Sequence, residues 1–263
     1  MSVEPGWCVV LGASSGFGAA AVRALAKAGL DVIGVHLDRK ATQPLAEAVK
    51  NEVLALGRRA LFFNVNAADR DQRDLVVRAA AEAMARGPRV RVLLHSLAFG
   101  TLRPLVAASS KEAVSPAQMA MTLEVMATSL VDWTEALVAT GLFERRARVF
   151  AMTSEGSRRV WPSYGPVGAA KAALESFVRQ LAVELAPQEI TVNALCAGVT
   201  QTPALAKIPG NAEMLEMALA RHPRGRLTTP EDVASALVAL AGPGCGWLTG
   251  NVIQVDGGEG LIA

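Results

Sequence analysis

Residues 7–21 read WCVVLGASSGFGAAA, and this stretch decides the fold. An apolar run is followed by a turn that contains Gly12, Gly16 and Gly18, and an Ala-rich segment comes next. Glycine lets a backbone turn tightly and approach a ligand closely, and the free N–H groups at a helix N-terminus attract a pyrophosphate. The stretch therefore predicts a strand, a phosphate-binding turn and a helix, and a dinucleotide is the natural ligand of such a turn.

The rest of the chain repeats this alternation of short apolar runs with longer periodic segments, which builds a parallel sheet covered by helices on both faces. We expect strands over residues 7–12, 31–35, 60–65, 90–96, 148–153, 190–196 and 252–256. We expect helices over residues 19–28, 43–56, 70–86, 116–140, 167–186 and 231–241. The prediction is an α/β fold, a doubly wound seven-stranded parallel sheet of the Rossmann type, formed by a single domain over residues 1–263.

One long insertion, at about residues 200–229, separates the sixth strand from the last helix and contains a helical segment near residues 213–220. It lies beyond the carboxyl ends of the strands, where open α/β sheets bind ligands, so we interpret it as a substrate lid. Its apolar side chains fit either a flexible acyl channel or an ordinary amphipathic helix, and both interpretations stay open. They are Ala204, Leu205, Ile208, Met214, Leu215, Met217 and Leu219.

Composition excludes several classes of function. The 263 residues are 51% apolar and carry a net charge of only +2, with Lys and Arg scattered, so neither a nucleic-acid-binding stripe nor a membrane-binding basic segment is expected. Residues 1–6 lack the features of a signal peptide, and no apolar run approaches the ~20 residues of a membrane span. Three cysteines at unrelated spacings indicate reduced thiols and a cytoplasmic protein, and three scattered histidines indicate no metal site.

Motifs along nearly the whole chain resemble those of the short-chain dehydrogenase/reductase superfamily. They are the turn at residues 12–18, the Asn64-Val65 pair, the turn at residues 95–100, Tyr164 with Lys171, and residues 193–198 and 249–258. The resemblance implies a nicotinamide cofactor held by Gly12, Ser14, Ser15, Gly16, Phe17, Gly18, Asp38, Arg39, Asn64, Val65, Ser96, Leu97, Ala98, Lys171, Gly198, Val199, Thr200 and Thr202. It also implies assembly as a homotetramer or homodimer.

Tyr164 is the only tyrosine of the chain, and Lys171 follows it by seven residues, close to two helical turns. Most members of the superfamily carry Tyr-x3-Lys, but here Val167 holds that position and cannot transfer a proton. The spacing Tyr-x6-Lys resembles the enoyl-[acyl-carrier-protein] reductases. Pro166 suits the first turn of a helix and can leave Tyr164 in the preceding loop.

The longer spacing has a geometric reason. When hydride attacks a carbonyl carbon, the oxygen that needs a proton is bonded to that carbon. When hydride attacks C3 of an enoyl thioester, negative charge gathers on the thioester oxygen, two carbons away. Three residues along a helix displace the acid by ~4.5 Å, which is of the order of the distance between C3 and the thioester oxygen.

Other residues resemble the same enzymes. The turn at residues 95–100 reads HSLAFG where the superfamily usually has Asn-Asn-Ala-Gly, and we interpret His95 as a structural histidine held by backbone. Many enoyl reductases have a second tyrosine at the position of Ser154. A serine there resembles a divergent bacterial subgroup of these enzymes, which retains the serine and uses NADPH. Ser154 either binds the substrate carbonyl or caps a strand. The helix-four asparagine of the superfamily is replaced near residues 124–126.

The resemblance thus implies catalysis by Tyr164, Lys171 and Ser154. The expected substrate contacts are Phe99, Gly100, Ser154, Tyr164 and Leu205. Asp38 favours NADH, whereas Arg39 and Lys40 favour the 2′-phosphate of NADPH. We expect NADPH, with NADH as the alternative.

The expected reaction is hydride transfer from NAD(P)H to C3 of a 2,3-unsaturated acyl thioester, as in the enoyl-[acyl-carrier-protein] reductases of fatty acid synthesis. A carbonyl or 3-oxoacyl reductase is the alternative, and a non-catalytic nucleotide-binding regulator is a third hypothesis. Five arginines flank the expected mouth and fit either an acyl carrier protein or coenzyme A, or plain solvated surface. They are Arg158, Arg159, Arg221, Arg224 and Arg226.

Overall fold

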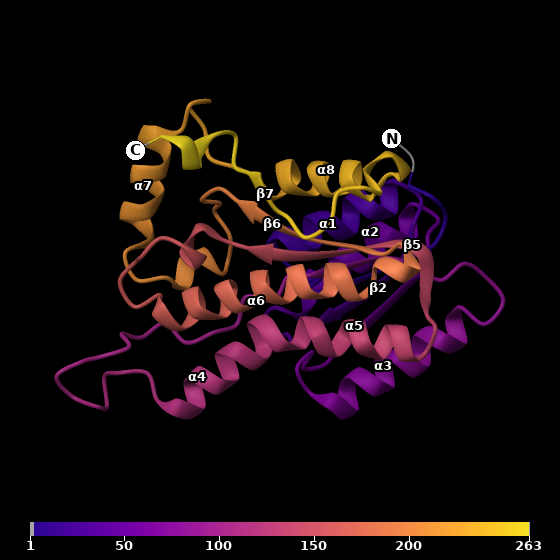
Figure 1. The fold of residues 1–263 in the computed structure, drawn as a ribbon, viewed down its shortest axis with the longest axis horizontal. Coiled ribbons are helices and arrows are strands. Elements are labelled where there is room, and N and C mark those ends of the chain that lie inside the picture. The colour runs from indigo at the N-terminus through magenta and orange to yellow at the C-terminus, as the bar shows by residue number, and fades with distance from the viewer. Residues whose placement is uncertain (1–2, 263) are drawn as a thin grey trace.

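The computed structural model describes residues 3–262 and forms one parallel sheet of seven strands in the order β3-β2-β1-β4-β5-β6-β7 (Figure 1). The strands are β1 (Trp7–Leu11), β2 (Asp31–His36), β3 (Ala60–Asn64), β4 (Val90–His95), β5 (Phe143–Thr153), β6 (Thr191–Ala197) and β7 (Val252–Val255). The strand order reverses between β1 and β4, and this is the position where doubly wound sheets bind dinucleotides. The predicted α/β fold is confirmed.

Helices cover both faces of the sheet, as Figure 1 shows. One layer consists of α1 (Gly16–Lys27), α2 (Gln43–Ala55) and α8 (Pro230–Ala241). The other consists of α3 (Arg70–Ala83), α4 (Pro116–Leu123), α5 (Ser129–Ala139) and α6 (Gly165–Glu184). The segment between β6 and α8 contains a short 3-10 turn (Leu205–Lys207) and α7 (Asn211–Arg221), close to the helix expected there.

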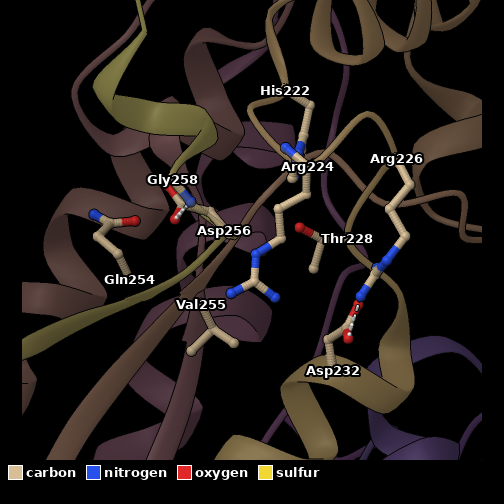
Figure 2. Close-up of a pocket in the computed structure, with 10 residues that line it drawn as sticks. His222, Arg224, Arg226, Thr228, Asp232, Gln254, Val255, Asp256 and Gly258 are labelled. Atoms are coloured by element: carbon tan, nitrogen blue, oxygen red, sulfur yellow. Dashed lines mark hydrogen bonds and ion pairs between the residues drawn. The ribbon is translucent and has the colours of Figure 1, made fainter.

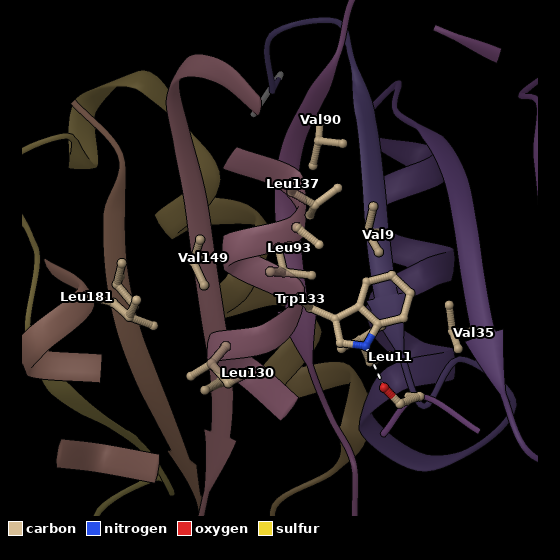
Figure 3. Close-up of a cluster of buried hydrophobic side chains, with 14 of the residues drawn as sticks. Val9, Leu11, Val35, Val90, Leu93, Leu130, Trp133, Leu137, Val149 and Leu181 are labelled. Carbon is tan, nitrogen blue, oxygen red and sulfur yellow. Dashed lines mark hydrogen bonds between the residues drawn. The ribbon is translucent and has the colours of Figure 1, made fainter. Parts of the chain in front are cut away.

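Alternate residues of the central strands supply two separate cores. Val9 and Leu11 of β1 pack with α3, α5 and α6, whereas Cys8 and Val10 face α1, α2 and α8. Figure 3 shows the first core around Trp133, whose indole N–H donates to the carbonyl of Ala67 at 2.7 Å. Burial on both faces explains why the strands read as continuous apolar runs.

Two elements differ from the sequence prediction. β5 begins at Phe143 rather than at 148, with a register shift against β4. The first residues of β5 include exposed charged side chains, so an apolar pattern does not predict them. In this part of β5, the Glu144 carboxylate accepts a hydrogen bond from the backbone N–H of Arg89 at 2.8 Å. The helix expected over residues 116–140 is divided by a π-helical turn, Glu124–Thr128, between α4 and α5.

Within residues 3–262, no helix combines the length and the apolar character that a membrane span requires. The three cysteines are free thiols, and Cys8 and Cys196 are buried.

Candidate active site

The phosphate-binding turn has the close backbone approaches that the sequence predicted. Gly12 has a φ of +90°, and a Cβ there would collide with the carbonyl oxygen of Ser96. A Cβ at Gly18 would likewise collide with the carbonyl oxygen of Gly12. α1 begins at Gly16 with no side-chain cap from Ser15 and no acidic residue in its first turn, so its N-terminal N–H groups are available to an anion. These residues fit the pyrophosphate of a dinucleotide.

Two further loops border this turn. The N–H of Ser96 donates to the carbonyl of Leu11 at 2.9 Å, which fixes the start of the loop at residues 96–98 over β1. A Cβ at Gly16 would lie 3.6 Å from Cγ2 of Thr202, so the beginning of the lid segment lies beside the turn. Thr200 is buried and donates to the carbonyl of Gly198 at 2.9 Å. The structure thus brings three predicted cofactor segments together.

Asp38 lies at the end of β2, where the adenosine ribose is expected. Its carboxylate lies 2.9 Å from Nδ1 of the buried His36, and Asn64 exchanges two hydrogen bonds with its backbone, at 2.8 and 3.0 Å. Burial raises the pKa of Asp38, but contacts with Thr42, Ser14 and His36 outweigh burial and hold the pKa below its ordinary value. Asp38 is therefore a charged, inward-held carboxylate. Arg39, Lys40 and Leu37 are exposed.

Tyr164 and Ser154 lie side by side just beyond the C-terminal end of β5. The Tyr164 hydroxyl lies 3.4 Å from Oγ of Ser154, and Tyr164 is the last residue before α6, with Pro166 in the first turn. The tyrosine therefore lies at the end of a loop, as Pro166 suggested. Burial raises the pKa of Tyr164, and the Ser154 hydrogen bond opposes that rise only in part. The phenol is a proton donor at neutral pH.

Lys171 is buried in α6, and its ammonium donates to the carbonyl of Met152 at 2.7 Å. Burial lowers the pKa of Lys171 to about 8, while the negative charge of Glu175 opposes the decrease. Glu175 is itself buried and accepts from the Thr153 hydroxyl at 2.7 Å. The structure therefore adds Glu175 to the site. An i, i+4 acid after Lys171 was visible in the sequence, but nothing there indicated its burial.

His95 is fully buried at the end of β4, and the partner of its Nε2 is the Ser129 hydroxyl at 2.8 Å rather than backbone. Ser129 in turn donates to the carbonyl of Val125, inside the π-helical turn. Burial, and next the charge of Lys171, lower the pKa of His95 to about 3. The imidazole is neutral at neutral pH, in line with a structural role.

The predicted substrate contacts Phe99, Gly100 and Leu205 differ from one another in how far they are buried. Phe99 is exposed, whereas the Gly100 backbone packs so closely that a Cβ would lie 2.7 Å from Sδ of Met126. Leu205 is buried rather than lining an open surface. The exposed apolar side chains of α7 are Met217 and Leu219, each about half exposed at 50% and 48%.

A hollow of about 410 Å³ is lined by neither Tyr164 nor Lys171. Figure 2 shows it beside the end of β7, with the guanidinium of Arg224 between Thr228 and Val255. A smaller hollow of about 200 Å³ borders Tyr164 and the loop of Gly156.

Three of the five arginines are engaged inside the protein. Arg159 pairs with Glu155 at 3.3 Å, Arg221 with Glu259 at 3.0 Å and Arg226 with Asp232 at 2.6 Å. Arg158 and Arg224 have no carboxylate within 4.0 Å among residues 3–262. Of these five arginines, Arg158 and Arg224 are thus the two without an ion pair in the described part of the chain.

Comparison with known proteins identifies the family of the chain. The sequence model of the family described as "Enoyl-(Acyl carrier protein) reductase" matches residues 12–259. The chain is 38% identical over 128 residues to 1-cyclohexenylcarbonyl-CoA reductase of Streptomyces collinus, an alignment that covers 48% of this chain and 45% of that one. It is 29% identical over 258 residues to the 3-oxoacyl-[acyl-carrier-protein] reductase FabG of Thermotoga maritima, covering 98% and 99% of the two chains.

Among solved structures, a short chain dehydrogenase from Burkholderia cenocepacia J2315 in complex with NADP superposes with a TM-score of 0.81 at 26% identity, over 97% of this chain and 98% of that one. The chain belongs to the enoyl-(acyl carrier protein) reductase family of the short-chain dehydrogenase/reductase superfamily, and it is a nicotinamide-dependent oxidoreductase.

Proposed function

We propose that the protein reduces the carbon-carbon double bond of a 2,3-unsaturated acyl thioester. The observation that carries the proposal is the position of its one phenol. Tyr164 faces Ser154 from the loop before α6, while Val167, where a carbonyl reductase of this superfamily keeps its acid, is buried and apolar. The first relative, a reductase of 1-cyclohexenylcarbonyl-CoA, supports the proposal by its printed substrate.

The residues divide the work as follows. A dihydronicotinamide cofactor, when bound, would supply the hydride that C3 of the substrate takes up. Electrons of the double bond then move onto the thioester oxygen, and the Tyr164 hydroxyl donates a hydrogen bond to that oxygen. Because burial keeps the Tyr164 pKa high, the phenol remains protonated for this role at neutral pH. Lys171 would hold the ribose hydroxyls of the cofactor, and Ser154 orients the Tyr164 hydroxyl. A proton from water, added at C2, completes the saturated thioester.

Isotope labelling tests this reaction. Crotonyl-CoA incubated with 4-deuterated NADH or NADPH should yield butyryl-CoA with one deuterium at C3. Tyr164→Phe should lower kcat by about 10²-fold to 10³-fold, the usual effect of removing one oxyanion donor, without weakening cofactor binding. If no trans-2-enoyl thioester yields a saturated product, the proposal is wrong.

A 3-oxoacyl reductase is the second candidate function. The FabG relative aligns over nearly its whole length, and Tyr164 is presented from a loop, which lets its reach differ from that of a helical residue. Acetoacetyl-CoA converted to 3-hydroxybutyryl-CoA would support this candidate.

For the cofactor, the surroundings of Asp38 favour NADH over the NADPH expected from the sequence. A carboxylate held inward by His36 accepts from a ribose 2′-hydroxyl and repels a 2′-phosphate, while the side chains of Arg39 and Lys40 lie in solvent. We expect kcat/KM to be higher with NADH, and Asp38→Ser to shift the preference toward NADPH by about tenfold or more. A higher kcat/KM with NADPH in the wild type would restore the original expectation.

The carrier and the assembly are further parts of the proposal. The thioester is carried by acyl carrier protein or coenzyme A, with Arg158 and Arg224 as the available cations. The protein acts in the cytoplasm as a homotetramer or homodimer, without nucleic acid or membrane. Mass photometry of the full chain tests the assembly.

A further inference from the structure

The chain makes a tight, well-defined turn after β7. Gly257 and Gly258 both adopt left-handed conformations, with φ of +63° and +94°. The buried Asp256 fixes the turn, because its carboxylate accepts from the N–H groups of Gly258 and Gly260 at 2.9 Å each. The next residues form a short 3-10 turn, Glu259–Leu261, so this part of the chain is held in place rather than trailing away.

Glu259 points from this turn into the protein and is only 3% exposed. One carboxylate oxygen accepts from the backbone N–H of Val199 at 2.9 Å, and the other accepts from Arg221, the last residue of α7, at 3.0 Å. A Cβ at position 198 would lie 2.7 Å from the carboxylate, so Gly198 is what permits this approach. A single buried acid therefore joins the loop at residues 198–202 to the lid helix.

The same turn also reaches the loop that carries the reacting groups. Arg159 donates to the carbonyl of Gly260 at 3.1 Å and pairs with Glu155 at 3.3 Å. Both residues lie between Ser154 and Tyr164 in the chain. The turn at residues 256–261 thus contacts three segments. They are the loop at residues 198–202, on the expected nicotinamide side of the cofactor site and here called the nicotinamide-side loop, the lid, and the loop between Ser154 and Tyr164.

We propose that Glu259 is a positioning residue whose carboxylate couples the nicotinamide-side loop to lid helix α7. A charge-assisted hydrogen bond is about twice as strong as a neutral one, and a buried ion left without its partner is strongly unfavourable. The loop and the lid are therefore stable in this arrangement only together. The proposal rests on the proposed function only for the choice of NADH as the ligand, because the coupling itself is visible by proteolysis without any ligand.

Glu259→Gln tests the coupling, since it keeps the size and one acceptor oxygen but loses the charge. The full chain is digested with thermolysin, which cleaves beside exposed apolar side chains such as Met217 and Leu219, and NADH binding is followed by fluorescence. We expect faster cleavage within residues 200–229 and a Kd for NADH raised by about tenfold. The matched control is Glu52→Gln, which breaks the surface pair with Arg23 at 2.5 Å on α1 and α2.

Arg221→Met is the second variant, because its side chain is partly exposed and its loss leaves the Val199 hydrogen bond intact. It should accelerate lid cleavage and raise the Kd for NADH at least as much as Glu259→Gln does, because it leaves the buried carboxylate of Glu259 without its cation. The double variant should be no worse than Arg221→Met, since Glu259→Gln removes the charge that Arg221→Met leaves unpaired.

The proposal is overturned if Glu259→Gln and Arg221→Met digest and bind NADH as Glu52→Gln does, whatever happens to their melting temperatures. If the wild type binds NADH but reduces no enoyl thioester, the proposed function fails while both measurements still test Glu259. If the wild type binds no nicotinamide cofactor, lid cleavage alone decides for or against the coupling.

Discussion

At the residue scale, the position of the Tyr164 ring depends on two glycines, Gly156 and Gly168, which have no side chain. A Cβ at Gly156 would collide with the ring at Cε1 and lie 2.8 Å from Cδ1. A Cβ at Gly168, in the first turn of α6, would lie 2.6 Å from the carbonyl oxygen of Gly156. Two glycines therefore bring the loop and the helix together and leave room for one orientation of the phenol.

Gly156→Ala should displace the phenol and lower kcat by about 10²-fold, the effect of a misplacement of about 1 Å, while NADH binding stays within about twofold. Gly244→Ala is the matched control, because a Cβ there meets no atom within 4 Å. Steady-state kinetics and NADH titration check the prediction. An unchanged kcat in Gly156→Ala would show that the ring has more freedom than its contacts imply.

Lys171 sets a pH dependence. Its pKa of about 8 predicts that kcat/KM declines above about pH 8 as the ammonium loses its proton. Stability changes in the opposite direction. Since the folded pKa lies below the ~10.4 of an unfolded lysine, the unfolded chain binds more protons between these values, and the contribution of Lys171 to stability rises with pH there.

The rate profile and urea unfolding are measured from about pH 6 to about pH 10 for the wild type and Lys171→Met. The variant should lose activity and also lose the rise in stability above about pH 8. A wild-type rate that stays constant to about pH 10 would contradict the assignment of Lys171 as a required cation.

At the scale of elements, apolar patterning located all seven strands, because each central strand is buried on both faces. The apolar pattern missed residues 143–147 of β5, where backbone hydrogen bonds rather than apolar side chains define the strand. It also missed the π-helical turn, whose residues continue a helical pattern. Arg221 was expected either to meet an anionic carrier or to be solvated surface, and Glu259 was not singled out, since their pairing joins segments 38 residues apart. The motif residues were predictable, but their supporting contacts were not.

The π-helical turn supports His95 through Ser129, and this yields a stability prediction. Ser129→Ala leaves a buried imidazole without its hydrogen-bond partner and should lower the free energy of unfolding by about 1–3 kcal/mol. Thr128→Ala is the control, because Thr128 makes the same bond to the carbonyl four residues earlier in a more exposed position. Urea unfolding compares the two variants. Equal decreases in the free energy of unfolding for the two variants would mean that the hydrogen bond between Ser129 and His95 does not stabilise the fold.

At the scale of the whole molecule, the sheet separates two cores that should contribute independently. Leu137 of α5 and Leu237 of α8 are both 1% exposed and lie on opposite faces. Each Leu→Ala change should cost about 2–5 kcal/mol of unfolding free energy, and the double variant should show the sum within about 0.5 kcal/mol. Leu54→Ala, at an exposed position, should change stability by less than about 0.5 kcal/mol. A clearly non-additive double variant would contradict independent cores.

The central claim is that the displaced phenol makes this fold an enoyl reductase. The most direct test is the rate of NADH and NADPH oxidation with crotonyl-CoA and acetoacetyl-CoA in parallel, for the wild type and Tyr164→Phe. We expect turnover of the enoyl thioester, largely lost in Tyr164→Phe, and little or no turnover of the oxo thioester. Turnover of the oxo thioester alone would contradict this expectation and make the protein a carbonyl reductase whose tyrosine acts from a loop.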